Sequence, residues 1–215
     1  MRAFNDLVIL QPREDLEKKW NSSVLYTPDS ALLSADDMVG FRHDHTAIAV
    51  VHRLPEDYTG SEIAVGDAVL LPLFCGSKVV IIDGQAYLSC KREAIAAKVV
   101  ALGEPSEKVE ALNGYILTRQ DAEAMQNRMN GGLILTDDYL DDGIPCDGGS
   151  DGIVRLVLER CVSVGNAYLN PTLQKPKQRK GELLGFNPFA SCRFRRFSVK
   201  YRLTPNESMQ FGLED

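Results

Sequence analysis

The sequence has no long hydrophobic run. No apolar stretch approaches the ~20 residues that a membrane-spanning helix needs, which argues against a membrane protein. The N-terminal region has an apolar run of only four residues, Leu7–Leu10, and no small-residue cleavage site follows it. We therefore expect no signal peptide and a cytoplasmic location.

Cysteine and histidine are scarce as well. The five cysteines are an odd number and form no CxxC pair. This argues against a disulfide framework or a structural zinc site and favours reduced thiols. The three histidines are His43, His45 and His52. An H-x-H pair on one strand face could hold a metal, but no nearby cysteine or second carboxylate pair completes the set, so we expect no metal site.

Motifs for catalysis and cofactor binding are absent. No G-x-S-x-G and no P-loop occurs, and the glycine-rich stretches do not stand in a strand–helix context that binds phosphate. The acidic stretch from Asp137 to Asp151 lacks the spacing of an EF-hand. We interpret it as a solvated loop, with a weak calcium site as the alternative. We expect no enzymatic activity and no cofactor.

The sequence does contain an internal repeat, between residues 5–27 and 113–136. Each stretch begins with a short β-rich run, Leu7–Leu10 or Tyr115–Thr118, and continues with a polar segment. Each then ends in two small residues, three apolar residues and a threonine. These are Ser22, Ser23, Val24, Leu25, Tyr26 and Thr27 in the first stretch, and Gly131, Gly132, Leu133, Ile134, Leu135 and Thr136 in the second. Such a match indicates a tandem duplication.

The repeat continues downstream in the same order. Val65–Leu71 matches Lys180–Phe186, and Gln85–Leu88 matches Val199–Arg202. The boundary between the copies is expected near residues 103–112, which are polar and include a proline. Three matches in one order and at nearly one period favour two copies of one domain.

Short β-branched runs recur within a copy. Glycine and proline punctuate them, and long helical periodicity is absent apart from a weak signal at 122–129. The predicted strands are Thr46–His52, Ala68–Leu73, Lys78–Ile82 and Gln85–Ser89, the last two joined by a turn at Asp83-Gly84. This pattern predicts an all-β barrel.

The order of these features resembles the GroES-type co-chaperonin (chaperonin-10 family). A strand is followed by a long polar loop that ends in Gly-Gly-aliphatic-aliphatic-Leu-Thr. A Val-Gly-Asp turn into an apolar strand, a hairpin and a final turn with a glutamate come next. The resemblance covers nearly the whole chain, once per half, as in tandem double-domain co-chaperonins, and a virus-encoded origin would fit its divergence. It implies two tandem GroES-like small β-barrels, at residues 1–104 and 105–215.

The resemblance assigns a role to the apolar segments of the repeat. In the family, this segment is the tip of a mobile loop that binds an apolar groove on a GroEL-type chaperonin ring. The implied partner-binding residues are Gly131, Gly132, Leu133, Ile134 and Leu135 in the second copy, and Val24, Leu25 and Tyr26 in the first. The first copy departs from the pattern because two serines replace the glycines. The alternative interpretation is that both runs are buried strands.

A basic segment, residues 175–202, stands out in an otherwise acidic chain. It holds nine lysines and arginines and one acid, Glu182, with Phe194 and Phe197 among the arginines. Basic residues interleaved with aromatics can bind single-stranded nucleic acid. We favour a solvated surface whose charges pair with acidic neighbours, because the acidic remainder would repel a polyanion.

Two functions are compatible with these features. The first is a non-enzymatic co-chaperonin that assembles into a homo-oligomeric ring, caps a chaperonin and regulates ATP-dependent folding. It would act in the cytoplasm, or in the host cytoplasm if virus-encoded. The second is a structural ring, collar or capsid-associated protein of a virion that reuses the same barrels.

Overall fold

A computed structural model describes residues 7–13, 15–16, 46–72, 77–119, 157–166, 176–186, 191–196 and 199–213. Most of these residues lie in strands. The strands are β1 (Leu7–Gln11), β2 (Thr46–Arg53), β3 (Ala68–Pro72), β4 (Lys78–Ile82), β5 (Gln85–Lys91), β6 (Ala97–Val100), β7 (Lys108–Ala111), β8 (Tyr115–Arg119), β9 (Val157–Val164), β10 (Leu183–Phe186), β11 (Cys192–Arg196), β12 (Val199–Pro205) and β13 (Met209–Leu213). Single-turn 3-10 helices, η3 (Arg92–Ala94) and η5 (Asn206–Ser208), precede β6 and β13. The all-β prediction is confirmed.

The strands of the first half lie close to where the sequence predicts them. Strands β1 to β4 cover the β-rich runs that indicated them, within the described part of the chain, and β5 covers the second arm of the predicted hairpin. Asp83 and Gly84 have φ values of 51° and 77°, which are those of a type I′ turn. This turn places Ile82 opposite Gln85 in the hairpin of β4 and β5, as predicted. The weak helical signal at 122–129 lies outside the described residues.

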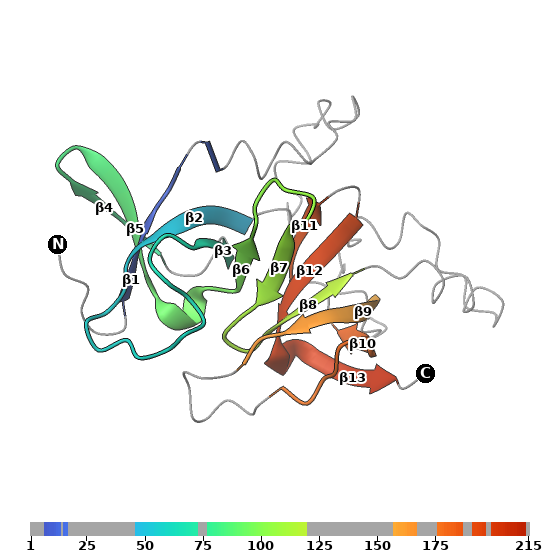
Figure 1. Ribbon diagram of the computed structural model, residues 1–215. Coiled ribbons are helices and arrows are strands. Elements are labelled where there is room, and N and C mark those ends of the chain that lie inside the picture. The colour runs from blue at the N-terminus through green and yellow to red at the C-terminus, as the bar shows by residue number, and fades with distance from the viewer. Residues whose placement is uncertain are drawn as a thin grey trace, which may run out of the picture.

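Two antiparallel sheets with the same internal order make up the fold (Figure 1). The first has the order β4-β5-β1-β2-β3-β6-β7, and the second has the order β11-β12-β8-β9-β10-β13. Strand β8 takes the place of β1, β9 that of β2, and so on to β13, which takes the place of β6. Among the described strands, only β7 has no counterpart. The edges are β4 and β7 in the first sheet, and β11 and β13 in the second.

The same irregularity interrupts both sheets. The pairing of β1 with β2 shifts register between Ile9 and Leu10. The pairing of β8 with β9 shifts between Leu117 and Thr118. A shift of register changes the face of the sheet to which the following side chains point. Because the shift occurs in both halves, it can be used to align their sequences residue by residue. Leu117 therefore corresponds to Ile9, and Thr118 corresponds to Leu10.

A glycine turn before β3 and β10 gives the second alignment. Gly66 and Gly181 have φ values of 96° and 93°, a region that a side chain disfavours. The Gly66 N–H donates to the Val51 carbonyl at 2.8 Å, and the Gly181 N–H donates to the Cys161 carbonyl at 2.9 Å. The match between Val65–Leu71 and Lys180–Phe186 that the sequence indicated is thus a match of backbone conformation.

The stretch 103–112, where the sequence predicts the boundary between copies, contains strand β7. This strand pairs with β6, with Ala97 opposite Ala111 and Val100 opposite Lys108. Lys108 and Glu110 are exposed, whereas Ala111 is buried. Because an edge strand of this kind alternates polar and apolar residues, its composition resembles that of a connector. The first sheet therefore extends to Ala111, just before the turn at Asn113 and Gly114 that leads into β8.

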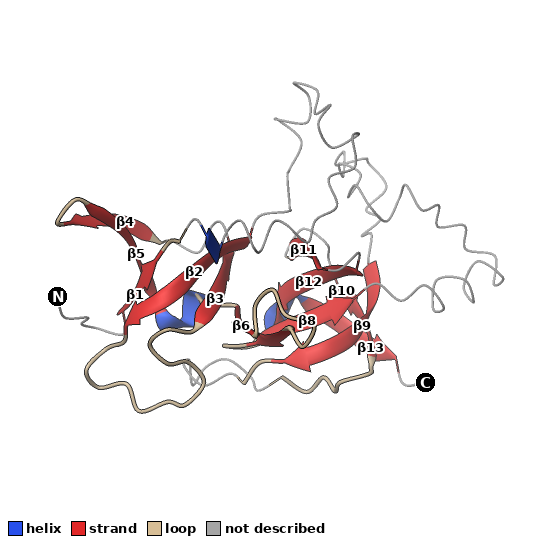
Figure 2. Cartoon of the chain, turned by 45° about the horizontal axis from the view of Figure 1, so that its top comes forward, coloured by secondary structure: helices blue, strands red, loops and turns tan. Residues whose placement is uncertain are grey.

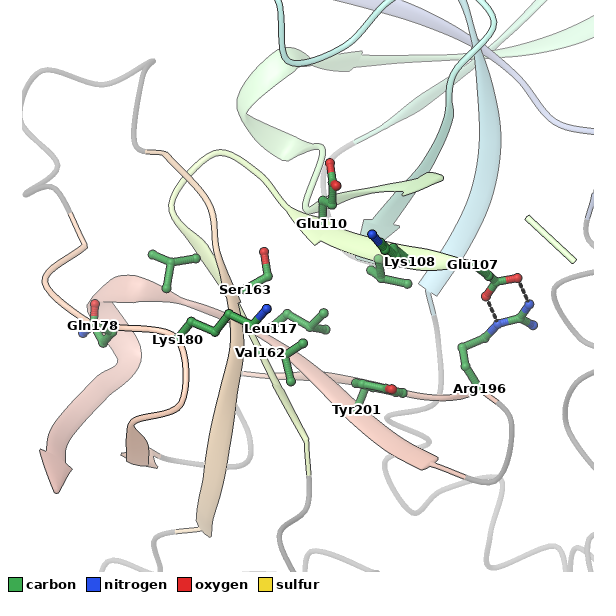
Figure 3. Close-up of a pocket in the computed structure, with 12 residues that line it drawn as sticks. Glu107, Lys108, Glu110, Leu117, Val162, Ser163, Gln178, Lys180, Arg196 and Tyr201 are labelled. Carbon is green, nitrogen blue, oxygen red and sulfur yellow. Dashed lines mark hydrogen bonds and ion pairs between the residues drawn. The ribbon is translucent and has the colours of Figure 1, made fainter. Parts of the chain in front are cut away.

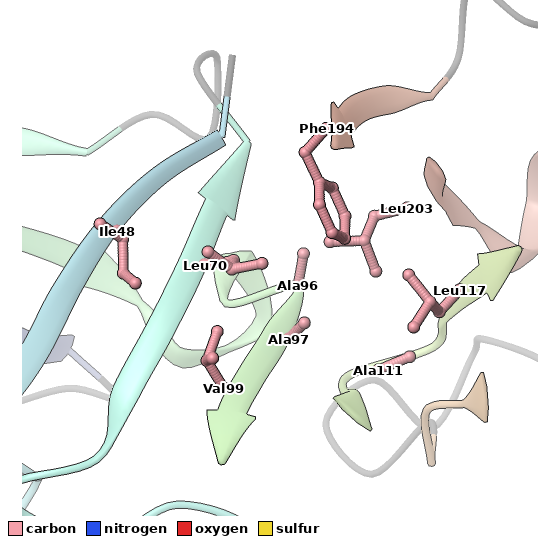
Figure 4. Packing of buried hydrophobic residues seen from close by; sticks show 9 residues of the cluster. All are labelled: Ile48, Leu70, Ala96, Ala97, Val99, Ala111, Leu117, Phe194 and Leu203. Atoms are coloured by element: carbon pink, nitrogen blue, oxygen red, sulfur yellow. The ribbon is translucent and has the colours of Figure 1, made fainter. Parts of the chain in front are cut away.

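One apolar cluster joins the two halves (Figure 4). It combines side chains of β2, β3, β6 and β7 with side chains of β8, β11 and β12. Its buried members are Ile48, Leu70, Ala96, Ala97, Val99, Ala111, Leu117, Phe194 and Leu203. Each half also has an apolar cluster of its own on the other face of its sheet. The two sheets consequently lie side by side against a shared core (Figures 1 and 2).

Candidate functional site

The predicted anchors, Val24–Tyr26 and Gly131–Leu135, lie outside the described residues. The strands before and after them in the chain are described. The first anchor belongs to the connection from β1 to β2, and the second belongs to the connection from β8 to β9. Each of these strand pairs is antiparallel and adjacent, and each carries the shared register shift. The two connections that contain the anchors therefore join equivalent strands of the two sheets.

A cavity of about 650 Å³ lies at the junction of the halves (Figure 3). One wall is β7 of the first sheet, with Lys108 and Glu110. The opposite wall comes from β8, β9 and β12, with Leu117, Val162 and Tyr201. The turn before β10 adds Gln178 and Lys180 from a third side. Strand β7, the element without a counterpart, is thus what creates this cavity.

An ion pair closes one end of the cavity and links the halves. The Arg196 Nε donates to Glu107 Oε1 at 2.5 Å, and its Nη2 pairs with Glu107 Oε2. Both side chains are almost fully buried. Two parallel hydrogen bonds between a guanidinium and a carboxylate fix the orientation of both groups. This pair therefore sets how β11 of the second sheet meets the turn before β7.

The cavity has the chemistry of a binding surface. Its lining residues include two lysines and two glutamates but no histidine and no cysteine. The hydroxyl of Ser163 accepts a hydrogen bond from the Ala111 N–H at 3.1 Å. The Oε1 atom of Gln178 is buried without a hydrogen-bond partner. These lining groups can offer charge and hydrogen bonds to a bound molecule.

The second half has a polar interior where the first half is apolar. The Arg202 Nε donates to Glu159 Oε1 at 2.6 Å, and the Thr118 hydroxyl donates to Glu159 Oε2 at 2.6 Å. All three residues are buried. Gln178 and Thr204 add buried oxygens without a hydrogen-bond partner. The equivalent positions of the first half hold Leu10, Ala49, Leu88, Ile63 and Cys90.

Sequence reasoning missed this polar interior. A glutamate in the middle of the run Val157–Val164 was the available signal, because a carboxylate in a buried strand needs a partner. Its partner Arg202 was assigned to the basic segment instead. The two residues are brought together by strands far apart in the chain, which no local pattern indicates.

The basic segment is partly internal. Arg196 and Arg202 are buried and paired with Glu107 and Glu159, so neither guanidinium is available to a phosphate. Phe194 is buried in the shared core and stacks on Tyr201 at a ring distance of 5.5 Å. These placements agree with the expected pairing with acidic neighbours, but they contradict the expected solvated surface, because the paired guanidinium groups and the Phe194 ring are buried.

The described histidine and cysteines show no metal site. His52 packs its ring 4.9 Å from the ring of Tyr87, and no group of three potential metal ligands occurs among the described residues. His43, His45 and the acidic stretch 137–151 lie outside them. Cys90, Cys161 and Cys192 are thiols that form no disulfide among the described residues. Burial, with a smaller contribution from the charge of Glu182, raises the pKa of Cys161 to about 11, so this thiol stays protonated and unreactive at neutral pH.

Within its described residues, the chain contains no helix long and apolar enough to cross a bilayer. Its distinctive features are the duplicated strand order, the junction cavity and the polar interior of the second half. No protein-family model matches the chain, and no curated protein matches it either.

Proposed function

We propose that the protein is a non-enzymatic co-chaperonin that caps a chaperonin ring through its two apolar anchors. The observation that carries the proposal is the duplicated strand order, in which both anchors belong to the same connection of equivalent strands. A duplicated scaffold with an apolar segment at the same place in each copy suits the binding of repeated sites on a symmetric partner. Each sheet would close into a small GroES-like barrel, and β7 assigns residues 108–111 to the first of them.

The proposed anchors act by burying apolar side chains in a groove of the partner. Leu133, Ile134 and Leu135 are three consecutive apolar residues that one strand face cannot bury together, because alternate side chains point to opposite faces. The preceding glycine pair gives the backbone freedom to adopt the bound conformation. Ordering such a segment on binding costs free energy, which keeps the contact reversible.

The two anchors would differ in strength. The first, Val24–Tyr26, follows two serines and ends in a tyrosine, which adds a hydroxyl to the apolar surface. The second has the glycine pair and three aliphatic residues. We therefore assign the main contact to the second half. Assembly into a homo-oligomeric ring would multiply this contact, because linked sites bind with a high effective concentration.

A capping assay tests the proposal. The purified chain is mixed with a bacterial chaperonin ring and ADP, and capped rings are counted by electron microscopy and followed by sedimentation. We expect capping by the wild type. Changing Leu133, Ile134 and Leu135 to serine should weaken it at least about a hundredfold, because three central apolar contacts are lost.

The matched control is the same change in the first half, with Val24, Leu25 and Tyr26 replaced by serine. This variant should retain more capping than the second-half variant. Capping that survives the second-half change would contradict the anchor assignment. Absence of capping by the wild type would contradict the co-chaperonin function, and its sedimentation with virus particles would favour the virion role.

A further inference from the structure

The outer edge of β7 borders the junction cavity. On its inner edge, β7 pairs with β6, and the Leu112 N–H just after it donates to the Ala96 carbonyl at 2.8 Å. The Ala111 N–H points the other way and donates to the Ser163 hydroxyl at 3.1 Å. Because successive residues direct their N–H and C=O groups to alternate edges of an antiparallel strand, those of Val109 point outward too. Since Val109 lines the cavity, a backbone donor and a backbone acceptor of β7 face it.

Two contacts between the halves mark the length of this open edge. Ser163 meets Ala111 at one end, and Arg196 pairs with Glu107 at the other (Figure 3). Glu107 and Ala111 are four residues apart, which is about 13 Å along an extended strand. Because β7 is the last strand in the order of its sheet, no strand of the described chain pairs with this stretch. The open edge therefore has the length of about four residues of an extended peptide.

The side chains around the open edge differ between the two faces of β7. Val109 packs against the core shared by the halves, and Leu117 and Tyr201 continue that apolar surface into the cavity. Lys108 and Glu110 lie on the opposite face from Val109, because alternate residues of a strand point to opposite faces, and both are exposed. A strand added beside β7 would therefore direct apolar side chains to one face and polar side chains to the other.

The polar groups of the cavity favour an acidic ligand. The buried ion pair at its end joins one positive and one negative charge. The other charged groups of the lining are Lys108, Lys180 and Glu110, two positive and one negative. The Oε1 atom of Gln178, from the same turn as Lys180, is buried without a hydrogen-bond partner, so it can accept an N–H from a bound molecule. A ligand that carries a carboxylate and several N–H groups matches these partners.

We propose that this cavity binds a short extended segment of another polypeptide, which adds as a strand along the outer edge of β7. The segment would run antiparallel to β7 and exchange two backbone hydrogen bonds with Val109. Its apolar side chains would cover Leu117 and Tyr201. An acidic side chain between them would reach the ammonium groups of Lys108 and Lys180. This peptide site is separate from the apolar anchors, so peptide binding requires no chaperonin.

Calorimetric titration of the full chain with the peptide acetyl-Val-Glu-Val-Thr-amide tests the proposal. At low ionic strength, the wild type should bind this peptide. Lys180→Glu replaces attraction with repulsion and should weaken binding about tenfold. The peptide acetyl-Val-Lys-Val-Thr-amide should bind this variant more tightly than it binds the wild type. The matched control is Lys177→Glu, the same change at an exposed lysine outside the cavity lining, and it should bind both peptides like the wild type.

N-methylation of both valines of the acidic peptide tests the added strand. The methylated peptide keeps every side chain but loses the N–H groups that would face Val109, so it should bind the wild type at least about tenfold more weakly. Equal binding of the two peptides would overturn strand addition. Binding of acetylglutamate amide as tight as that of the peptide would overturn it in favour of a small-anion site.

Two further outcomes would overturn the proposal. One is a wild type that binds none of these peptides, and the other is an equal loss of binding in Lys177→Glu and Lys180→Glu. Circular dichroism checks that both variants fold. The methylated and unmethylated peptides are compared on the wild-type chain, so this comparison decides even where a variant does not fold. None of these titrations contains a chaperonin, and the serine variants test capping separately.

Discussion

Replacing Glu159 with alanine is expected to lower the free energy of unfolding by about 3–5 kcal/mol. Glu159 is buried and receives hydrogen bonds from Arg202 and Thr118, each at 2.6 Å. Without the carboxylate, the Arg202 guanidinium keeps its buried place but loses its counter-charge. The measurement is urea unfolding of wild type and variant at one pH, followed by circular dichroism.

The chain provides its own control for this prediction. The first half carries Leu10, Ala49 and Leu88 at the positions of Thr118, Glu159 and Arg202. The triple variant T118L/E159A/R202L copies that apolar set into the second half. We expect it to recover wild-type stability or to exceed it by about 1–4 kcal/mol, because apolar residues of similar volume can replace a buried ion pair. If the free energy of unfolding of Glu159→Ala lay within about 0.5 kcal/mol of the wild-type value, the buried Arg202 guanidinium would not need Glu159 as its counter-charge.

The second large effect is expected for Phe194→Ala, at about 3–5 kcal/mol of lost stability. Phe194 is buried where β11 meets the first half, and it stacks on Tyr201 with an interplanar angle of 15°. Truncating the ring leaves a cavity in the core that both halves share, so the loss should lower the unfolding midpoint of the whole chain. Thermal and urea unfolding measure it.

Val80→Ala is the matched control for the phenylalanine variant. Val80 lies opposite Tyr87 as Phe194 lies opposite Tyr201, so it occupies the equivalent place in the first half. It is partly exposed, so its truncation should cost less than about 1 kcal/mol at concentrations where the chain is monomeric. Equal effects of the two variants would contradict a core shared by the halves. An effect of Phe194→Ala confined to the second half, with the first half unfolding as before, would contradict it as well.

Much of the fold follows from local sequence patterns. Short β-rich runs predicted β1 to β4, because β-branched runs of four to eight residues bounded by turn residues are typical of strands. Asp83-Gly84 predicted its hairpin, since both residues tolerate positive φ. The matches around Gly66 and Gly181 aligned the two sheets, because such a turn has few sequence solutions.

Other parts depend on contacts between distant residues and had no local signal. Strand β7 is polar on one face and short, so its sequence resembled a connector between domains. The shared core depends on how one sheet meets the other, and Phe194 entered it from a segment that looked like a nucleic-acid surface. The pairs Glu107–Arg196 and Glu159–Arg202 join residues 89 and 43 positions apart in the chain. Charge that is paired in the fold therefore looked exposed in the sequence.

Some candidate functional residues likewise have a local sequence signal, whereas others depend on contacts between distant segments. The repeat placed the two apolar anchors in equivalent connections, and the strands on either side of them agree with that placement. The junction cavity could not be foreseen, because β7, β9 and the turn before β10 contribute to it from three parts of the chain.

Hydrogen–deuterium exchange of the full chain, alone and with a chaperonin ring and ADP, tests the central claim most directly. The account predicts that peptides covering Gly131–Leu135 become protected when the ring is added, with weaker protection at Val24–Tyr26. Peptides from β2 and β3 should exchange as before. Unchanged exchange at both anchors in a mixture saturated with ring, or protection confined to other surfaces, would contradict the proposal that these segments bind the chaperonin.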